Sequence, residues 1–247
     1  MAEVSVQFLG TGDAFGSGGR LQTCFYVDAG AVRFLIDCGT SSLIALKRWG
    51  LSTSQIDVIL LTHLHADHFG GVPFFLLDAR VMAKRTKPLI IAGPPGLEPR
   101  IRQAQDVLFP GTPTMRLGFP IEFIEIWDRK STELGQLVVT PYQVEHGGGA
   151  PAYALRVECG GKVIAYSGDT EWTPALAEAA RGADLFICEA NFFDKKVNHH
   201  MNYRTLMEHR DELECKRLIL THMGEEMLSR IGSLEVEGAE DGQRIVL

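Results

Sequence analysis

The sequence predicts an α/β fold, organised as one domain over residues 1–247. Short runs rich in β-branched and aromatic residues alternate with helix-like stretches along the chain. No linker rich in proline, glycine or serine, no block of like charge and no low-complexity tract divides the 247 residues. We therefore expect strands at the front of each half of the chain and helices dispersed between them.

Eleven runs have the composition of strands. In chain order they are VSVQFLG, CFYVDAG, VRFLIDCG, IDVILLTH, PLIIAG, IEFIEIW, QLVVTPY, YALRVE, KVIAYSGD, DLFICEA and RLILTH. The first expected helix has Thr40, Ser41 and Ser42 as N-cap candidates and Gly50 as its stop. The other expected helices cover residues 71–84, 97–108, 174–180 and 203–213.

Two pairs of segments resemble each other across the halves of the chain. VILLTHLHADH is answered by RLILTHMGEEM, and FLIDCG is answered by VIAYSGD. Each pair is an apolar strand that ends in polar residues. This pattern favours a duplicated architecture with a site along a shared edge, where strand ends converge.

Composition excludes several classes of protein. The five cysteines are scattered and form no CxxC pair, so we expect small buried apolar residues and neither a disulfide framework nor a zinc knuckle. The formal net charge of −7 argues against binding long nucleic acid by charge alone. The start MAEVSVQFLG lacks the features of a secretory signal, and no stretch is apolar enough to cross a membrane, so we expect a cytoplasmic protein.

The stretch ILLTHLHADHFGG, residues 59–71, concentrates metal-ligand chemistry after an apolar strand. In extended backbone His63 and His65 point to the same side and can approach one ion. Asp67 and His68 follow where the chain turns towards the next helix, and can face a second ion. The spacing therefore predicts a metal site at the end of this strand.

THLHADH resembles the signature of the metallo-β-lactamase fold superfamily, and further motifs follow the order expected for it. They are LIDCG with Asp37, VEHGGG with His146, YSGDT with Asp169 and ILTHM with His222. The resemblance implies a four-layer αββα sandwich with a dinuclear metal site at one edge. It implies two ligand groups: His63, His65 and His146 for one ion, and Asp67, His68 and His222 for the other, with Asp169 bridging them.

Imidazoles and carboxylates suit zinc, so two Zn²⁺ ions are expected, with Mn²⁺ or Fe as alternatives. Two such ions would activate a water and stabilise charge on the attacking and leaving oxygens. Asp37 is the expected acceptor that orients a histidine. For Thr62 and Thr221, hydrogen bonding at a strand end is the simpler expectation.

Three segments are similar to the ribonuclease Z and related phosphodiesterase branch: LGTGDAFGSGGRLQT, KPLIIAGPPGL and CEANFFDKKVNHHMN. That resemblance implies a catalytic pair, Glu189 and His200, beside the metals. A carboxylate raises the pKa of the imidazole and fixes its tautomer, which suits a group that protonates a leaving oxygen. The alternatives are a capping role for Glu189, a surface position for His200, and His199 in place of His200.

The predicted function is a dinuclear zinc hydrolase, specifically a phosphodiesterase acting on small phosphodiesters or short nucleotides. Asp67 would orient the attacking water or accept its proton. The alternatives are hydrolysis of a lactone, thioester or lactam, and transfer RNA 3′-processing as in ribonuclease Z. Redox chemistry at a di-iron centre and a non-catalytic scaffold are disfavoured because all seven ligand positions are filled.

Long RNA is not expected to be a substrate. The arm that grips transfer RNA in ribonuclease Z is often inserted after the motif of the isolated histidine. Here only two strand-like segments separate His146 from the YSGDT motif. The basic cluster of Arg80, Lys84, Arg85 and Lys87 is expected to be a solvated helix end rather than a substrate contact. A homodimer is compatible with the sequence.

The glycine-rich start, GTGDAFGSGG, is not a dinucleotide-binding fingerprint. Phe15 stands where GxGxxG requires its last glycine. We expect these glycines to allow a tight loop close to the metal centre.

Overall fold

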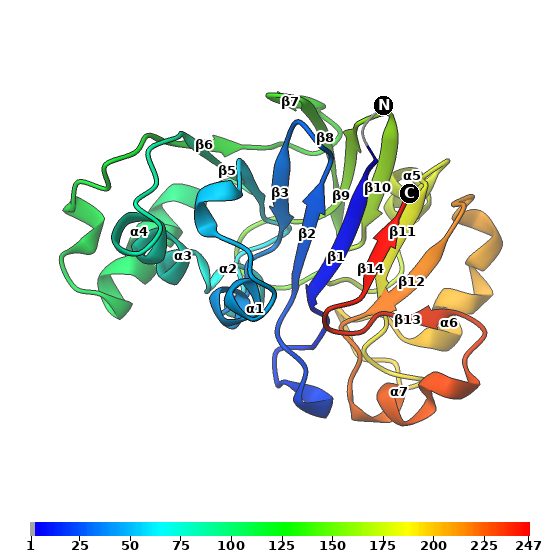
Figure 1. The fold of residues 1–247 in the computed structure, drawn as a ribbon. Coiled ribbons are helices and arrows are strands. Elements are labelled where there is room, and N and C mark those ends of the chain that lie inside the picture. Colours follow the sequence, from blue (N-terminus) through cyan, green and yellow to red (C-terminus); the bar gives the residue numbers. More distant parts are fainter. Residues whose placement is uncertain (1–2) are drawn as a thin grey trace.

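The computed structural model describes residues 3–247, which form two seven-stranded sheets packed face to face with helices on both outer faces (Figure 1). This arrangement is the four-layer α/β sandwich that the sequence predicts. Both sheets are mixed, with antiparallel strands in one part and parallel strands in the other.

The first sheet has the strand order β14-β1-β2-β3-β4-β5-β6. β3 to β6 are parallel, and β1 has the same direction because it and β3 are both antiparallel to β2. The ends of β1, β3 and β4 therefore lie at one edge. The bounds are β1 Ser5–Gly10, β2 Cys24–Asp28, β3 Arg33–Ile36, β4 Val58–Leu60, β5 Leu89–Gly93, β6 Ile121–Glu125 and β14 Arg244–Val246.

The second sheet has the order β13-β12-β11-β10-β9-β8-β7. β10 to β13 are parallel, and β8 has their direction because it pairs antiparallel with β9, as β10 does. The ends of β8, β10, β11 and β12 thus lie at a common edge. The bounds are β7 Thr132–Leu134, β8 Leu137–Val144, β9 Ala152–Cys159, β10 Lys162–Tyr166, β11 Leu185–Glu189, β12 Leu218–Thr221 and β13 Glu237–Gly238.

Helices cover the two outer faces. α1 (Ser42–Arg48), α3 (Val72–Val81) and α4 (Leu97–Leu108) lie on the side of the first sheet. α5 (Pro174–Ala180), α6 (Tyr203–Glu208) and α7 (Glu225–Arg230) lie on the side of the second. α2 (Ala66–Phe69) is a single turn that follows β4. This arrangement leaves a central apolar layer between the sheets and one apolar layer under each set of helices.

Aromatic rings join the two sheets in the central layer. Phe25 of β2 packs edge-on against Phe8 of β1, with ring centroids 5.2 Å apart. It also packs edge-on against Tyr166 of β10 in the other sheet, at 5.0 Å. All three side chains are fully buried. Edge-to-face contacts of this kind add to the free energy gained by burying the rings.

The expected elements are largely confirmed. All eleven expected strands are present, and the helices predicted over 97–108 and 174–180 have the predicted bounds. The helix predicted over 203–213 breaks after Glu208 and continues as a 3₁₀ turn, Arg210–Glu212. The sequence did not reveal α7 or the short strands β7, β13 and β14, which contain only two or three residues each.

The cysteines behave as expected from their spacing. All five are free, and four of them are buried, Cys215 being partly exposed. Burial raises the pKa of Cys24 to about 12, so its thiol stays protonated. Within residues 3–247, no helix combines the length and apolar character that a membrane crossing needs.

Two residues of the basic cluster, Arg85 and Lys87, are held by other parts of the protein, which corrects the expectation of a solvated helix end for them, whereas Lys84 is exposed as expected. Arg85 is only 3% exposed and donates hydrogen bonds to the carbonyls of Thr53 and Lys87, both at 2.8 Å. Lys87 Nζ lies 2.6 Å from Asp57 Oδ1. These residues precede β5, so they lie at the edge of the sheet opposite to the one where the parallel strands end. Arg85 and Lys87 thus hold the loop before β5 against the segment Thr53–Asp57.

Candidate metal centre and active site

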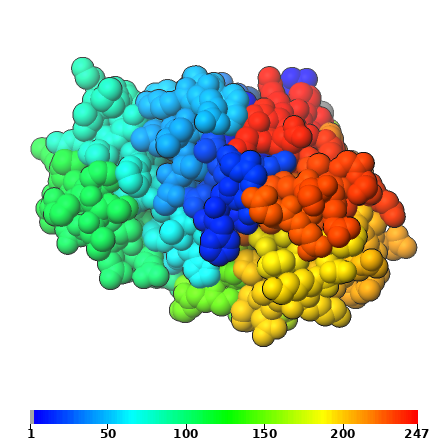
Figure 2. All heavy atoms as spheres, turned by 90° about the horizontal axis from the view of Figure 1, so that it is seen from below, coloured from blue at the N-terminus to red at the C-terminus, as the bar shows by residue number. Residues whose placement is uncertain are grey.

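The polar residues that the sequence singled out follow strand ends from both sheets. Because the strands that precede them run in one direction within each sheet, their ends meet along one edge. Figure 2 looks onto the lower side of Figure 1, where this edge lies and where segments far apart in sequence meet. The segments that reach the edge contain Thr11, Asp37, His63, His146, Asp169, Glu189 and His222.

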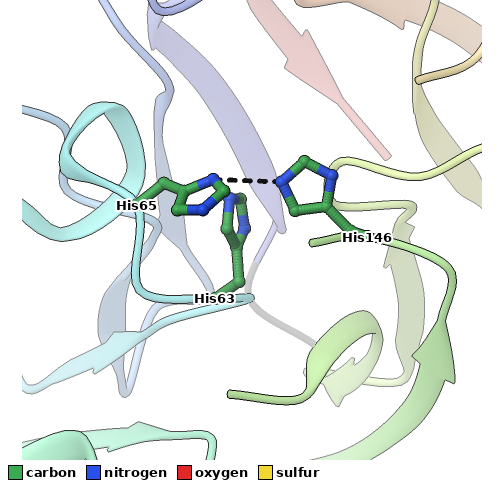
Figure 3. A group of neighbouring side chains, drawn as sticks. All are labelled: His63, His65 and His146. Atoms are coloured by element: carbon green, nitrogen blue, oxygen red, sulfur yellow. Dashed lines mark hydrogen bonds between the residues drawn. The ribbon is translucent and has the colours of Figure 1, made fainter. Parts of the chain in front are cut away.

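The first group consists of His63, His65 and His146, whose rings point towards one another (Figure 3). His65 Nδ1 and His146 Nε2 are 3.0 Å apart. The ring of His63 lies 4.8 Å from that of His65 and 4.7 Å from that of His146. The structure thus brings together the three histidines that the resemblance assigned to one ion.

The second group consists of Asp67, His68, Asp169 and His222, all buried. His68 Nε2 lies 3.3 Å from Asp67 Oδ2 and 3.2 Å from Asp169 Oδ1. His222 Nε2 lies 3.3 Å from Asp67 Oδ2 and 3.4 Å from Asp169 Oδ2. Asp169 also lies close to His146 and His200, so it stands between the two groups.

The backbone around HxHxDH differs from the expected strand end. β4 ends at Leu60, and His63 and His65 lie in the loop that follows it. Asp67 and His68 belong to the single turn α2, which the sequence did not reveal. Gly71 allows the next helix to approach the loop after β3, since a Cβ there would lie 2.1 Å from the carbonyl oxygen of Gly39.

Asp37 orients His68, as expected. His68 Nδ1 lies 2.6 Å from Asp37 Oδ2, while Asp37 also accepts hydrogen bonds from the backbone N–H and the hydroxyl of Thr62. The Thr62 hydroxyl lies 3.0 Å from His63 Nδ1. Thr62 therefore connects His63 to the carboxylate of Asp37, which holds His68 directly.

His146 is held by a backbone group rather than by a side chain. Its Nδ1–H donates to the backbone carbonyl of His199 at 2.9 Å, which leaves Nε2 free to face the cluster. The side chain of His199 is exposed. The contribution of His199 to the site is thus a backbone carbonyl, which residue type alone does not reveal.

Glu189 and His200 form the expected pair. Glu189 is fully buried, and its Oε2 lies 3.1 Å from His200 Nδ1. The other carboxylate oxygen accepts a hydrogen bond from the backbone N–H of Thr170, so Glu189 also fixes the loop that carries Asp169. Both roles considered from the sequence, pairing and backbone capping, are present together.

The cluster divides electrostatically between its two groups. Burial lowers the pKa of His63, His65 and His146, so these imidazoles stay neutral and keep a lone pair for a metal ion. Burial also opposes charge on His68, but Asp169 and Asp37 outweigh it and raise the pKa of His68 well above its usual range. In the same way, Asp169 raises the pKa of His222 to about 9 against the effect of burial.

Burial also favours the neutral form of the carboxyl groups, yet nearby imidazoles reverse that effect at two of them. His222 and His68 hold the pKa of Asp67 below its usual range, and they hold that of Asp169 well below it. At Glu189, burial and the charge of Asp169 prevail and raise the pKa of the carboxyl group. The carboxylates of the second group are therefore ionised at neutral pH, as metal ligands must be.

The donor set fits metal ions. Three buried atoms that face the cluster, His63 Nε2, His68 Nε2 and Asp169 Oδ1, have no hydrogen-bond partner among the described residues. Two ligand atoms bound to one tetrahedral zinc ion are about 3.3 Å apart, given bonds of about 2.0–2.1 Å. The separations of 3.0 to 3.4 Å between donor atoms match that spacing.

Two residues that support His222, Thr11 and Asn191, were not found from the sequence. His222 has a positive φ of 56°, which is strained for a non-glycine residue. Its N–H donates to the carbonyl of Thr11 at 2.9 Å, and its carbonyl accepts from Asn191 Nδ2 at 3.1 Å. These bonds hold the strained backbone from both sides. The contact of Thr11 confirms that the glycine-rich start forms a loop at the centre.

A model of the family described as "Anti-Pycsar protein Apyc1" matches residues 4–239. The chain belongs to this family. The ribonuclease Z of Lachnoclostridium phytofermentans is 28% identical over 271 aligned positions, which cover 89% of this chain and 87% of the relative.

Solved structures of a tRNase Z and of a metallo-β-lactamase fold protein are similar to this chain over nearly their whole length. The structure of human tRNase Z, short form, has a TM-score of 0.78 against this chain at 26% identity, with 98% of each chain covered. The metallo-β-lactamase fold protein YhfI of Bacillus subtilis has a TM-score of 0.77 at 20% identity, with 100% of each chain covered. The chain therefore has the metallo-β-lactamase fold and is a metal-dependent hydrolase of the ribonuclease Z-like nuclease and phosphodiesterase group.

The role of Asp37 leads to a first prediction. Asp37→Ala removes the acceptor of His68 Nδ1, and we expect metal affinity to fall on the order of 10- to 100-fold, as for other partners of ligating histidines. Competition with a chromogenic chelator measures this. Asp28→Ala, at the far end of β2, is the control and should leave metal affinity unchanged. Equal affinities for both variants and the wild type would show that Asp37 does not support the centre.

Proposed function

We propose that the chain is a dinuclear zinc phosphodiesterase that acts on small phosphodiesters or short nucleotides. The observation that carries the proposal is the presence of two groups of metal donors beside a buried carboxylate–histidine pair. In this assignment His63, His65 and His146 hold one ion, and Asp67, His68 and His222 hold the other. Asp169, which stands between the groups, bridges the two.

Two zinc ions would supply Lewis acidity and an activated water at this edge. Asp67 would orient that water or accept its proton, since its carboxylate is ionised and lies 3.3 Å from the Nε2 atoms of both His68 and His222. His200 donates a proton to the leaving oxygen, and Glu189 holds its Nδ1 so that Nε2 is directed away from the carboxylate. Glu189 outweighs burial and raises the pKa of His200, which keeps the imidazole protonated closer to neutral pH.

Several features favour a small substrate over transfer RNA. The net charge is −7, and Arg85 and Lys87 of the basic cluster are engaged at the edge of the sheet remote from the site. β9 and β10 fill the segment where a gripping arm is often inserted. The alignment with the ribonuclease Z of L. phytofermentans is longer than this whole chain, so the relative contains residues that this chain lacks within the matched region.

Transfer RNA 3′-processing is the second candidate, because the curated relatives are named ribonuclease Z and ribonuclease BN and a structural neighbour is named tRNase Z. Hydrolysis of a lactone, thioester or lactam would use the same donors. The Glu189–His200 pair argues against that reaction class, because it supplies a proton donor for an alkoxide leaving group.

The donor set predicts the metal content. Protein purified without chelator should contain about two zinc ions per chain, because seven donors complete two sites. Elemental analysis measures this directly. His222→Ala, which disturbs only the second group, should retain about one ion. Trace metal alone in the wild type, with no uptake when zinc is added, would refute the whole mechanism.

The role of His200 gives a prediction about leaving groups. His200→Ala should keep its metal but lose on the order of 10²- to 10⁴-fold in kcat on an unactivated phosphodiester. The loss should shrink for a p-nitrophenyl ester, whose leaving group needs no proton. His199→Asn is the matched control, since it keeps the backbone carbonyl that His146 uses and tolerates the positive φ at this position. Equal losses on both esters would indicate a structural role for His200.

The choice of substrate gives another prediction. At about 0.15 M salt, where exposed charges are screened, the protein should hydrolyse bis(p-nitrophenyl) phosphate or a cyclic nucleotide and leave 3′-extended transfer RNA essentially uncut. Both substrates are assayed side by side with the same enzyme stock. Efficient, site-specific removal of the transfer RNA trailer would overturn the preference for small substrates and establish the second candidate.

A further inference from the structure

An apolar hollow adjoins the first group of histidines. It has a volume of about 360 Å³ and lies between the segment that follows β4 and the outer side of α4. Six of its nine lining residues are apolar, and His65 forms part of its wall. The lining residues used below are Leu64, His65, Arg100, Ala104, Val107 and Leu108.

The apolar surface of this hollow is unusual for the outer side of a helix. Val107 is 76% exposed and Leu108 is 45% exposed, although both belong to α4, whose buried side already includes Leu97 and Ile101. The fold therefore does not need these two side chains in its core. An exposed apolar surface next to a candidate metal ligand is a typical feature of a ligand site.

A second hollow continues the first towards His146. It is lined by Leu64 and Arg100, which it shares with the first, and by Gly148, Gly149 and Ala150 from the loop after His146. That loop passes close to His65, since a Cβ at Gly148 would lie 2.6 Å from His65 Nε2. The two hollows thus adjoin through Leu64 and Arg100, and together they extend from His65 to the loop that follows His146.

The opposite side of the cluster has a different character. A hollow there is lined by His200 and five other polar residues, among them Lys196 and Asn198, and by three apolar ones, Trp172, Val197 and Met201. His146 stands between the two sides, with its ring 4.9 Å from that of His65 and 5.2 Å from that of His200. The proton donor therefore faces the polar side, and the apolar surface lies beyond His65.

We propose that the hollow between Leu64 and α4 receives the nucleobase of the part of a phosphodiester that keeps the phosphate, while the leaving group departs on the side of His200. This inference rests on the proposed phosphodiesterase function. A nucleobase combines an apolar ring face with polar edges. Leu64, Ala104 and Val107 offer apolar contact, and Arg100 offers guanidinium donors and a planar face.

Arg100 is free to take this role. It is exposed, and its guanidinium has one weak hydrogen bond among the described residues, to Gln103 at 3.5 Å. Its positive charge at the mouth of the hollow also complements the negative charge of a phosphodiester. An uncharged apolar ligand would gain nothing from this residue, so the chemistry favours a nucleotide.

Two substrates with the same leaving group test the proposal: the p-nitrophenyl ester of thymidine 5′-phosphate, which has a base, and methyl p-nitrophenyl phosphate, which has none. The wild type should have a higher kcat/KM for the nucleoside ester. Ala104→Phe, which fills the hollow, should lower that preference on the order of 5-fold or more, as expected when base contacts are lost. It should leave kcat/KM for the methyl ester within about 2-fold, because the methyl ester places no group in the hollow.

Exposed residues supply a second variant and its control. Val107→Ser removes apolar surface from the hollow and should weaken the preference in the same direction. Val81→Ser changes the same residue type at the end of α3, where the side chain is 54% exposed and outside the hollow, and should have no effect. Light scattering on every variant checks whether the hollow is instead an interface between two copies of the chain.

The outcomes separate the inference from the proposed function. Turnover of both esters by the wild type without preference for the nucleoside ester would overturn the nucleobase site alone. Equal losses on both esters in Ala104→Phe, or a changed oligomeric state, would also overturn it. Absence of turnover with either ester in the zinc-loaded wild type would refute the phosphodiesterase function itself, and the nucleobase site with it.

Discussion

The site depends on one constraint: ionisable side chains are buried at the edge between two sheets, and each must find a partner there. An unpaired buried polar group costs free energy, and four imidazoles of the site have one nitrogen held by a neighbouring group while the other faces the cluster. His68 is held by Asp37, His63 by Thr62, His146 by the carbonyl of His199, and His200 by Glu189. These bonds fix ring orientation before any ion binds.

The same constraint accounts for local features of the backbone. Asp37 and His222 both have positive φ values, which are rare for residues with a side chain. Each is held in that conformation by neighbours, Asp37 through its bonds with Thr62 and His222 through Thr11 and Asn191. Strain of this kind persists at functional sites where the surrounding structure determines the geometry.

Negative charge is concentrated at the candidate metal centre. Carboxylates belong to the second group of donors, whereas Arg85 and Lys87 hold a loop at the remote edge of the sheet. The chain therefore lacks an obvious surface for many phosphates, yet it has a centre that can neutralise one. The apolar surface beside His65 and the polar hollow beside His200 then give the two sides of that centre different preferences.

The sequence by itself determined the α/β fold class and most of the strands and helices, and, with the family resemblance, it named the candidate residues of the metal cluster. It did so because apolar periodicity and the HxHxDH spacing are local signals. It also predicted the shared edge from the repeated Thr-His strand ends.

The tertiary structure alone decided the strand order and the groups that support the cluster, because both depend on contacts between distant segments. β11 lies between β10 and β12, whereas β3 and β4 are neighbours, so the repeated segments do not occupy equivalent places. The carbonyl of His199, the amide of Asn191 and the buried position of Arg85 likewise follow from packing, which residue type does not encode.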